Sequence, residues 1–124
     1  MKDFHDLKVW SKAHNLALAT YAATAAFPRS ERLGLTGQMR RCCASIATNI
    51  AEGCGREGEN ELRHFLSIAR GSASELEYQF LLARDLEYLP PTDHDRLANE
   101  VTQIKRMLTV FMQRVGHHTP KAES

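Results

Sequence analysis

Four arginines offer the clearest chemistry in this sequence, and all four fall on stretches with helical spacing. Arg40 and Arg41 are neighbours on one stretch, whereas Arg63 and Arg70 lie on one strip of the next. A planar guanidinium suits carboxylate or phosphate groups, which it can bind through two parallel hydrogen bonds. The sequence therefore leaves two interpretations open: a nucleic-acid-binding patch, or ion pairs with glutamates of this chain or of another subunit.

A row of polar side chains that can form hydrogen bonds follows the same two stretches. It comprises Gln38, Ser45, Asn49 and Glu52 on the first stretch and Ser72 and Glu75 on the second. Polar groups buried beside a core cost about 1–3 kcal/mol each when they lack a partner. We therefore expect a polar network that fixes helix register and holds subunits together. The alternative is a ligand pocket, but no nucleophile or base accompanies the row.

The main candidate metal ligands are Glu61 and His64, a Glu-x-x-His pair of the kind found in di-iron helix bundles, whereas His117 and His118 are better explained as part of a solvated tail. Such sites need a second pair and two further inward-facing glutamates, and the sequence has no second pair. Cys42 and Cys43 follow two arginines that would favour a thiolate, but Cys42 falls on the core-facing side of its helix. We predict buried structural thiols, no metal, no cofactor and no catalytic residue, so that a ligand- or metal-binding enzyme is the least favoured interpretation.

The composition indicates one small domain in a reducing compartment. The chain has 124 residues and a formal net charge of +1, which gives no overall preference for nucleic acids or membranes. Its three cysteines form no disulfide framework. Neither a signal peptide nor an apolar run of about 20 residues is visible. We therefore expect a cytoplasmic location and no membrane contact.

Apolar residues recur at alternating spacings of three and four in four stretches, which is typical of helices packed in a bundle. The first predicted helix covers residues 7–26, and the second follows an N-cap at Thr36 and ends near residues 53–55. The third covers residues 60–88, and the fourth covers 93–115 after an N-cap at Thr92. Because the connections are short, we predict an all-α, antiparallel up-down-up-down four-helix bundle over residues 1–116 and a disordered tail over 117–124.

The same spacing assigns the core-facing residues of each helix, which in the second helix are Leu35, Met39, Cys42, Ile46 and Asn49. In the first helix they are Leu7, Trp10, His14, Ala17, Tyr21 and Thr24, so His14 is expected to be packed and hydrogen-bonded. In the third helix they are Leu62, Leu66, Ala69, Ala73, Leu76, Phe80 and Ala83. In the fourth helix they are Leu97, Val101, Ile104, Leu108, Phe111 and Val115. We expect Phe27 to close one end of the bundle.

Several blocks of the sequence, in order, resemble the family of 23S rRNA-intervening sequence proteins. The early blocks are Leu7, Trp10, Phe27, Pro28, Glu31, Gly34 and Leu35. An arginine-rich helix follows with Gln38, Arg40, Arg41, Ser45, Asn49, Ile50, Ala51, Glu52 and Gly53. A later signature comprises Phe65, Leu66, Ala69, Gly71, Ser72, Glu75 and Leu76. The chain departs from the family pattern at Cys42 and Cys43, where members more often carry small residues.

This resemblance implies a four-helix bundle that assembles into a homopentamer. Some relatives are encoded inside rRNA intervening sequences, and others resemble the accessory variability determinant of diversity-generating retroelements. The resemblance therefore suggests RNA or DNA and, by analogy, a reverse transcriptase as partners. We predict a non-enzymatic, self-associating scaffold associated with nucleic acid, whose hypothetical contacts are the four arginines described first. The alternative is a protein–protein adaptor bundle without nucleic-acid binding.

Overall fold

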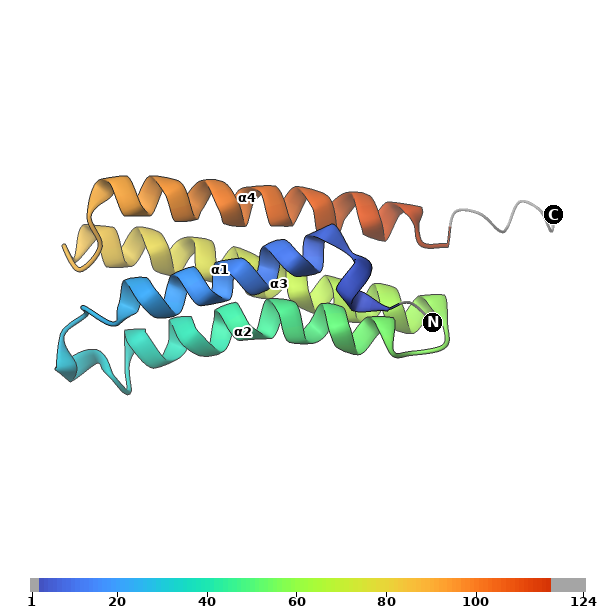
Figure 1. Ribbon diagram of the computed structural model, residues 1–124, viewed down its shortest axis with the longest axis horizontal. Coiled ribbons are helices and arrows are strands. Elements are labelled where there is room, and N and C mark those ends of the chain that lie inside the picture. Colours follow the sequence, from blue (N-terminus) through green and yellow to red (C-terminus); the bar gives the residue numbers. More distant parts are fainter. Residues whose placement is uncertain (1–2, 117–124) are drawn as a thin grey trace.

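Four long helices make up the protein in this computed structural model, which describes residues 3–116 (Figure 1). They are α1 (Lys8–Thr24), α2 (Leu35–Cys54), α3 (Glu59–Asp85) and α4 (Pro91–Arg114), with short 3-10 turns η1 (Phe4–Asp6) and η2 (Arg29–Glu31). Within these residues there is no strand, and no helix is both long and apolar enough to cross a bilayer. The predicted all-α four-helix bundle is confirmed, whereas the predicted tail at 117–124 lies outside the described residues.

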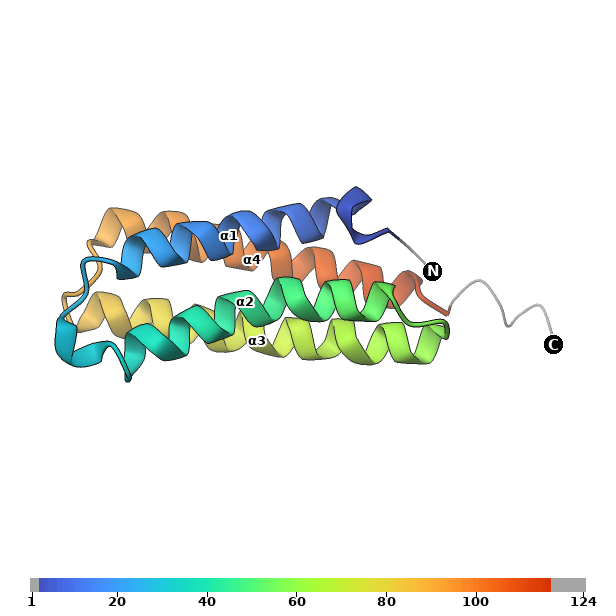
Figure 2. The same cartoon turned by 60° about the horizontal axis from the view of Figure 1, so that its bottom comes forward.

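Successive helices run in opposite directions. The α1–α2 and α3–α4 connections lie at one end of the bundle, and the α2–α3 connection lies at the other (Figure 1). Each helix contacts the next, and α1 also contacts α4, so the four helices form a closed ring in chain order. Figure 2 shows the same arrangement from another side, with α1 and α4 above α2 and α3. The ribbon therefore follows an up-down-up-down path.

The core lies along the axis of this bundle and confirms the predicted seams of α3 and α4. In α3, the buried members of the seam are Leu66, Ala69, Ala73, Leu76, Phe80 and Ala83. In α4, they are Leu97, Val101, Ile104 and Leu108, with Val115 following the helix. Each fully buried large apolar side chain contributes about 1.5–3 kcal/mol relative to exposure, so these two helices supply much of the stability.

The predicted seam of α1 is confirmed at Thr24 but is otherwise wrong by about one position. The buried residues of α1 are Val9, Ala13, Leu16, Thr20 and Thr24. His14, predicted to be packed in the core, is exposed, and its ring stacks on that of Trp10 with centroids 5.2 Å apart. The small side chains allow α1 to approach its neighbours closely, and the amphipathic rings lie at the edge with their polar atoms near water.

The predicted N-caps at Thr36 and Thr92 are also wrong. The helix α2 begins before Thr36, and the N–H of Leu35 donates to Oε1 of Glu31 at 3.0 Å. A carboxylate in the preceding loop therefore satisfies a free N–H at the start of α2. The helix α4 begins directly at Pro91, whose fixed φ and missing N–H suit the first position of a helix.

The helix α3 ends three residues earlier than predicted, because the chain turns into a left-handed conformation. Glu87 has a φ of 66°, and the N–H of Tyr88 donates back to the carbonyl of Ala83 at 2.9 Å. This is the hydrogen-bond pattern of a Schellman motif. The Tyr88 hydroxyl then donates to Oε2 of Glu31 at 2.9 Å, and its ring packs against buried Phe27. Phe27 closes this end of the bundle, as predicted.

Candidate functional site

Arg40 is fixed against the C-terminal end of α1. Its Nε donates to Oγ1 of Thr24 at 2.9 Å, and its Nη2 donates to the carbonyl of Tyr21 at 3.2 Å. The guanidinium also lies 4.7 Å from the centroid of the Tyr21 ring. A cation at this position complements the negative end of the helix dipole, and it adds a second partner to the Tyr21 carbonyl, which also accepts a hydrogen bond from the Thr24 hydroxyl. Arg41, the next residue, is exposed and forms no ion pair within residues 3–116.

Arg63 and Arg70 face α4 instead. Arg63 donates through Nη2 to the carbonyl of Val115 at 2.6 Å, at the C-terminal end of α4. Arg70 donates through Nη1 to Oγ1 of Thr109 at 3.1 Å. The C-terminal ends of α1 and α4 lie at opposite ends of the bundle (Figure 1), so Arg40 and Arg63 are far apart. The structure therefore does not bring the four predicted arginines into one patch.

The two polar rows meet at one point between α2 and α3. The hydroxyls of Ser45 and Ser72 are 2.9 Å apart. The amide of Asn49 donates to the carbonyl and to the hydroxyl of Ser45, at 2.8 and 2.9 Å. This small network bridges the two helices, and all three side chains are half-buried. Because every member has a partner, the network can fix the register of α2 against α3.

The remaining members of the rows are exposed on the outer face of α2 and α3. Glu52 pairs with Arg56 at 2.7 Å, in the chain leading from α2 to α3, rather than with α3. Gln38 and Glu75 are exposed, and Gln38 forms no side-chain hydrogen bond within the described part of the chain. These groups do not build a pocket, and they stay accessible on the surface of the isolated subunit.

The two adjacent thiols are buried, as predicted. The Sγ of Cys42 donates to the carbonyl of Ser72 at 3.0 Å, and Cys43 is fully buried. Burial raises the pKa of Cys42 to about 12, with a further contribution from the nearby charge of Glu75. Burial likewise raises the pKa of Cys43 to about 11. Both thiols are therefore protonated near neutral pH, which makes them poor nucleophiles and poor metal ligands.

Glu61 and His64, the Glu-x-x-His pair, are both exposed near the start of α3. The ring of His64 lies edge-on to that of Phe65. Within residues 3–116 no group of three or more histidine, cysteine, aspartate or glutamate side chains is placed to hold a metal ion. The geometry of a di-iron site is therefore not assembled in this part of the chain.

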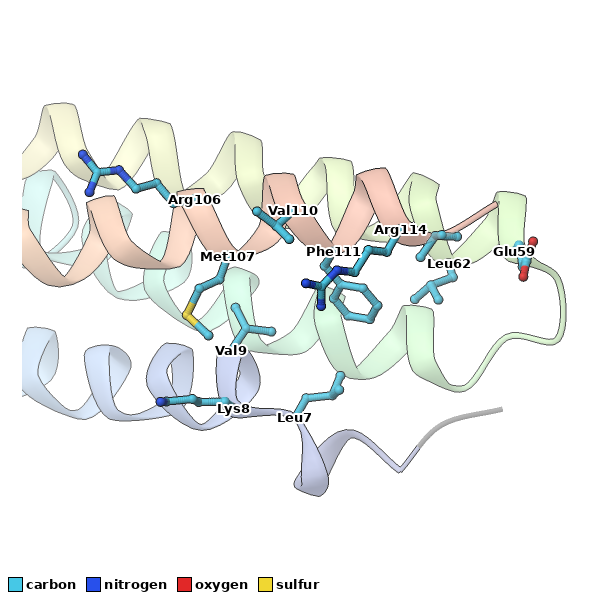
Figure 3. A pocket seen from close by; sticks show the side chains of 11 residues that line it. Leu7, Lys8, Val9, Glu59, Leu62, Arg106, Met107, Val110, Phe111 and Arg114 are labelled. Atoms are coloured by element: carbon cyan, nitrogen blue, oxygen red, sulfur yellow. The ribbon is translucent and has the colours of Figure 1, made fainter. Parts of the chain in front are cut away.

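A groove that the sequence patterns did not reveal lies between α1 and α4, beside the start of α3 (Figure 3). We call it the α1–α4 groove; its volume is about 700 Å³. Its apolar lining comprises Leu7, Val9, Leu62, Met107, Val110, Phe111 and Val115. Lys8, Arg106 and Arg114 lie among these residues and form no ion pair within the described residues. One residue in the sequence could have indicated this groove: Val110 is an apolar residue beside the predicted seam of α4, and it is 43% exposed.

A second, smaller pocket lies where α1 connects to α2, and we call it the arginine pocket. Its volume is about 360 Å³. It is lined by Thr24, Ala25, Phe27, Pro28, Arg29, Arg32, Thr36 and Arg40. Arg29 and Arg32 form no ion pair within residues 3–116, and the buried hydroxyl of Thr36 has no hydrogen-bond partner there. The sequence patterns assigned no role to Arg29 and Arg32 and gave Thr36 only as an N-cap, although two arginines in the connection before a helix were a usable signal.

Comparisons with known proteins give a family and a fold. Residues 5–110 match the family model described as 23S rRNA-intervening sequence protein. A crystal structure of a protein of unknown function from Bacteroides thetaiotaomicron, of the S23 ribosomal protein family, is similar with a TM-score of 0.77 and 23% identity. That similarity covers 85% of this chain and 98% of the other, and it extends to the fold alone. No curated protein matches the chain.

Proposed function

This chain belongs to the family of 23S rRNA-intervening sequence proteins, and from that premise we propose that it is a non-enzymatic scaffold that self-associates and binds the phosphate backbone of RNA or DNA. The observation that carries this proposal is the group of arginines at the α1–α2 end. Arg29, Arg32 and Arg40 line one pocket. Arg41 does not line the pocket, but its guanidinium lies beside the same loop: a Cβ built on Gly37 would lie 3.3 Å from Nη1 of Arg41 and 2.9 Å from the main-chain carbonyl of Arg32.

The charge of residues 25–41 differs from that of the chain as a whole, because this stretch holds Arg29, Arg32, Arg40 and Arg41 against the single acidic residue Glu31. The net charge is only +1, and Lys12, Arg56, Arg84 and Lys105 are among the cations that pair with carboxylates of the chain. Arg29, Arg32 and Arg41 have no such partner within the described residues. Phosphate contacts of this kind position a nucleic acid without reading its bases, so binding should tolerate different sequences.

Self-association, which the family resemblance suggests as a homopentamer, is supported by the outer face of α3. Ile68, Gly71, Glu75 and Tyr78 recur there at spacings of three and four. Ile68 and Tyr78 are 39% and 59% exposed. A glycine inside a helix costs about 0.5–1 kcal/mol relative to alanine, and a Cβ on Gly71 would meet no atom of residues 3–116 within 4 Å. A second copy that approaches closely would explain this glycine, and a ring would add the weak phosphate contacts of each subunit.

The alternative function, a protein–protein adaptor, is favoured by the α1–α4 groove. Its apolar walls contain Met107 and the 43%-exposed Val110, and exposed apolar surface of this kind marks interaction sites. An adaptor would use this groove and would not need the arginine pocket. The two functions therefore assign different surfaces and can be separated by mutation.

The test measures the affinity of the oligomer for structured RNA and duplex DNA by fluorescence anisotropy at low and physiological salt. The triple variant Arg29→Gln/Arg32→Gln/Arg41→Gln removes the unpaired charges and leaves Arg40, which also supports α1, in place. Binding by the wild-type protein should weaken steeply with salt, and the variant should bind at least about tenfold more weakly with a shallower salt dependence.

The matched control is Arg106→Gln/Arg114→Gln, which removes exposed arginines from the α1–α4 groove. It should bind nucleic acid as the wild-type protein does, and both variants must retain the wild-type oligomer. If the wild-type protein does not bind at low salt, or the triple variant binds equally well, the nucleic-acid proposal is wrong and the adaptor function is favoured.

A further inference from the structure

We propose that the arginine pocket is a specific site for one phosphate group, which Arg29, Arg32 and Arg40 bind together with the hydroxyl of Thr36. The phosphate is either a free ion or the phosphomonoester of a larger molecule. The inference rests on the proposed function only where the phosphate belongs to a nucleic acid, and there it adds a terminal phosphate to the backbone phosphates that the proposed function already assigns.

Arg40 is already oriented for this task. Its bonds to Thr24 and Tyr21 use Nε and one hydrogen of Nη2, so further N–H groups of the guanidinium are available. Because Thr24 is itself buried and bonded to the carbonyl of Thr20 at 2.8 Å, the support for Arg40 is rigid. A guanidinium that is held in place before binding loses less conformational entropy when it binds an anion.

Thr36 provides an independent indication of a ligand. It is only 7% exposed and lines the pocket, yet its Oγ1 has no hydrogen-bond partner within the described residues. A buried hydroxyl without a hydrogen-bond partner is destabilising unless a bound group forms the missing hydrogen bond. Because the Oγ1 of Thr36 is shielded from solvent, a phosphate oxygen reaches it only when the side chains that cover it move aside. The three arginines supply the charge that brings a phosphate there.

The position of Thr36 adds the field of a long helix. Thr36 is the second residue of α2, which has 20 residues, and the positive end of a helix favours anions. The nearest acidic group in the same loop is Glu31, and it does not pair with the arginines. Its two oxygens accept hydrogen bonds from the Leu35 N–H and the Tyr88 hydroxyl.

The size of the pocket limits what enters it. A volume of about 360 Å³ is at the lower end of ligand sites, which measure about 300–1,000 Å³. The pocket therefore suits a phosphate with the first atoms of its ester rather than a phosphate with a stacked base. The recognised chemistry is the dianionic phosphate end, whichever molecule carries it.

The first experiment follows the melting temperature of the oligomer as inorganic phosphate replaces chloride at constant ionic strength. A ligand that binds only the folded state raises the melting temperature with its concentration. We expect such a rise for the wild-type protein and for Arg106→Gln. Phosphate binding should weaken about tenfold in Thr36→Val, which keeps the shape but removes the hydroxyl. It should weaken at least as much in Arg29→Gln/Arg32→Gln, which changes only the loop. The absence of a rise in the wild-type protein, or an equal rise in Thr36→Val, would overturn the proposal.

The second experiment distinguishes the two sources of phosphate. The same RNA is titrated with a 5′-phosphate and with a 5′-hydroxyl, and Thr36→Val is tested in parallel. If the 5′-phosphorylated RNA binds more tightly and Thr36→Val removes the difference, the pocket holds a nucleic-acid end. If phosphate binds and RNA does not, the pocket stands, its ligand is a small phosphorylated molecule, and the proposed nucleic-acid function fails. If RNA binds but phosphate neither raises the melting temperature nor competes, the pocket proposal fails and the proposed function stands.

Discussion

Glu87 is the residue whose backbone the fold strains most clearly. Apart from glycine, it alone among residues 3–116 has a positive φ, 66°, and it does so to end α3. A left-handed conformation costs a residue with a Cβ about 1–2 kcal/mol, a penalty that glycine does not have. We therefore predict that Glu87→Gly raises the free energy of unfolding by about 1 kcal/mol in a urea titration. Glu87→Ala removes the carboxylate but retains the strain, so it should change stability little; equal effects of the two substitutions would contradict this explanation.

The buried thiols make the stability sensitive to alkaline pH. The pKa of Cys42 is about 12 and that of Cys43 about 11 in the folded protein, against an ordinary value of 9.0. Above pH 9 the unfolded chain binds fewer protons than the folded one, so the free energy of unfolding falls as pH rises towards these values. The slope reaches about 1.4 kcal/mol per pH unit for each thiol. Between pH 9 and 11, Cys42→Ala/Cys43→Ala should lose stability more slowly than the wild-type protein. Identical slopes would show that these thiols ionise as readily in the folded protein as in the unfolded chain.

The candidate residues illustrate why the site was only partly predictable. The types and spacing of Arg40 and Arg63 identified them as anion-binding groups, and both bind oxygen atoms in the structure. Those atoms are the carbonyls of Tyr21 and Val115, at the C-terminal ends of α1 and α4. Spacing along one helix specifies the face on which a residue lies, but it does not specify which other helix ends against that face.

At the scale of the helices, a substitution in the middle of α4 is the most direct test of the core assignment. Ile104 is fully buried in the middle of α4, where a carboxylate has no partner and no water. We predict that Ile104→Asp lowers the free energy of unfolding by about 4 kcal/mol, near the upper end of single-residue effects. Asn99→Asp introduces the same side chain at an exposed position of α4 and should change stability by less than about 0.5 kcal/mol. If Ile104→Asp has the same melting temperature as the wild-type protein, the assigned core is wrong.

The helices also show how far the sequence determines the fold. The seams of α3 and α4 could be predicted, because large apolar residues mark the buried face of each helix: Leu66, Leu76 and Phe80 in α3, and Leu97, Ile104 and Leu108 in α4. The seam of α1 could not, because its large residues Trp10 and Tyr21 lie at the edge while small residues such as Ala13 are buried. Hydrophobic size alone therefore indicates the wrong face when a helix packs through alanine and threonine.

Helix ends were predicted less accurately than helix existence, for a physical reason. The groups that cap α2 and α3 are close in sequence but are unusual residue types: the Glu31 side chain accepts from the Leu35 N–H, and a glutamate, Glu87, takes the left-handed position that ends α3. The Tyr88 hydroxyl then donates to Glu31 from the connection that follows α3. Such bonds link both connections at one end of the bundle. The usual preferences for threonine at an N-cap and for glycine at a left-handed helix end therefore do not identify these two ends.

At the scale of the whole molecule, the last prediction follows from the proposed self-association. Gly71 lies on the outer face of α3 beside Ile68 and Tyr78, where the isolated chain leaves open space. A leucine there meets no atom of residues 3–116 close to its Cβ and has a better helix propensity, so the subunit should fold at least as well. In an oligomer that brings another backbone close to Gly71, the same leucine forces the two subunits apart.

We therefore predict that the wild-type protein is an oligomer at micromolar concentration and that Gly71→Leu dissociates it while helicity, measured by circular dichroism, is retained. Asn99→Leu places the same side chain on the exposed side of α4 and should leave the oligomer intact. Light scattering gives the mass directly, against 14.0 kDa for one chain. A wild-type mass of one chain throughout the micromolar range would exclude self-association, since assembly follows mass action. An oligomer that survives Gly71→Leu would instead place the interface on another face, and the α1–α4 groove would then be the next surface to test.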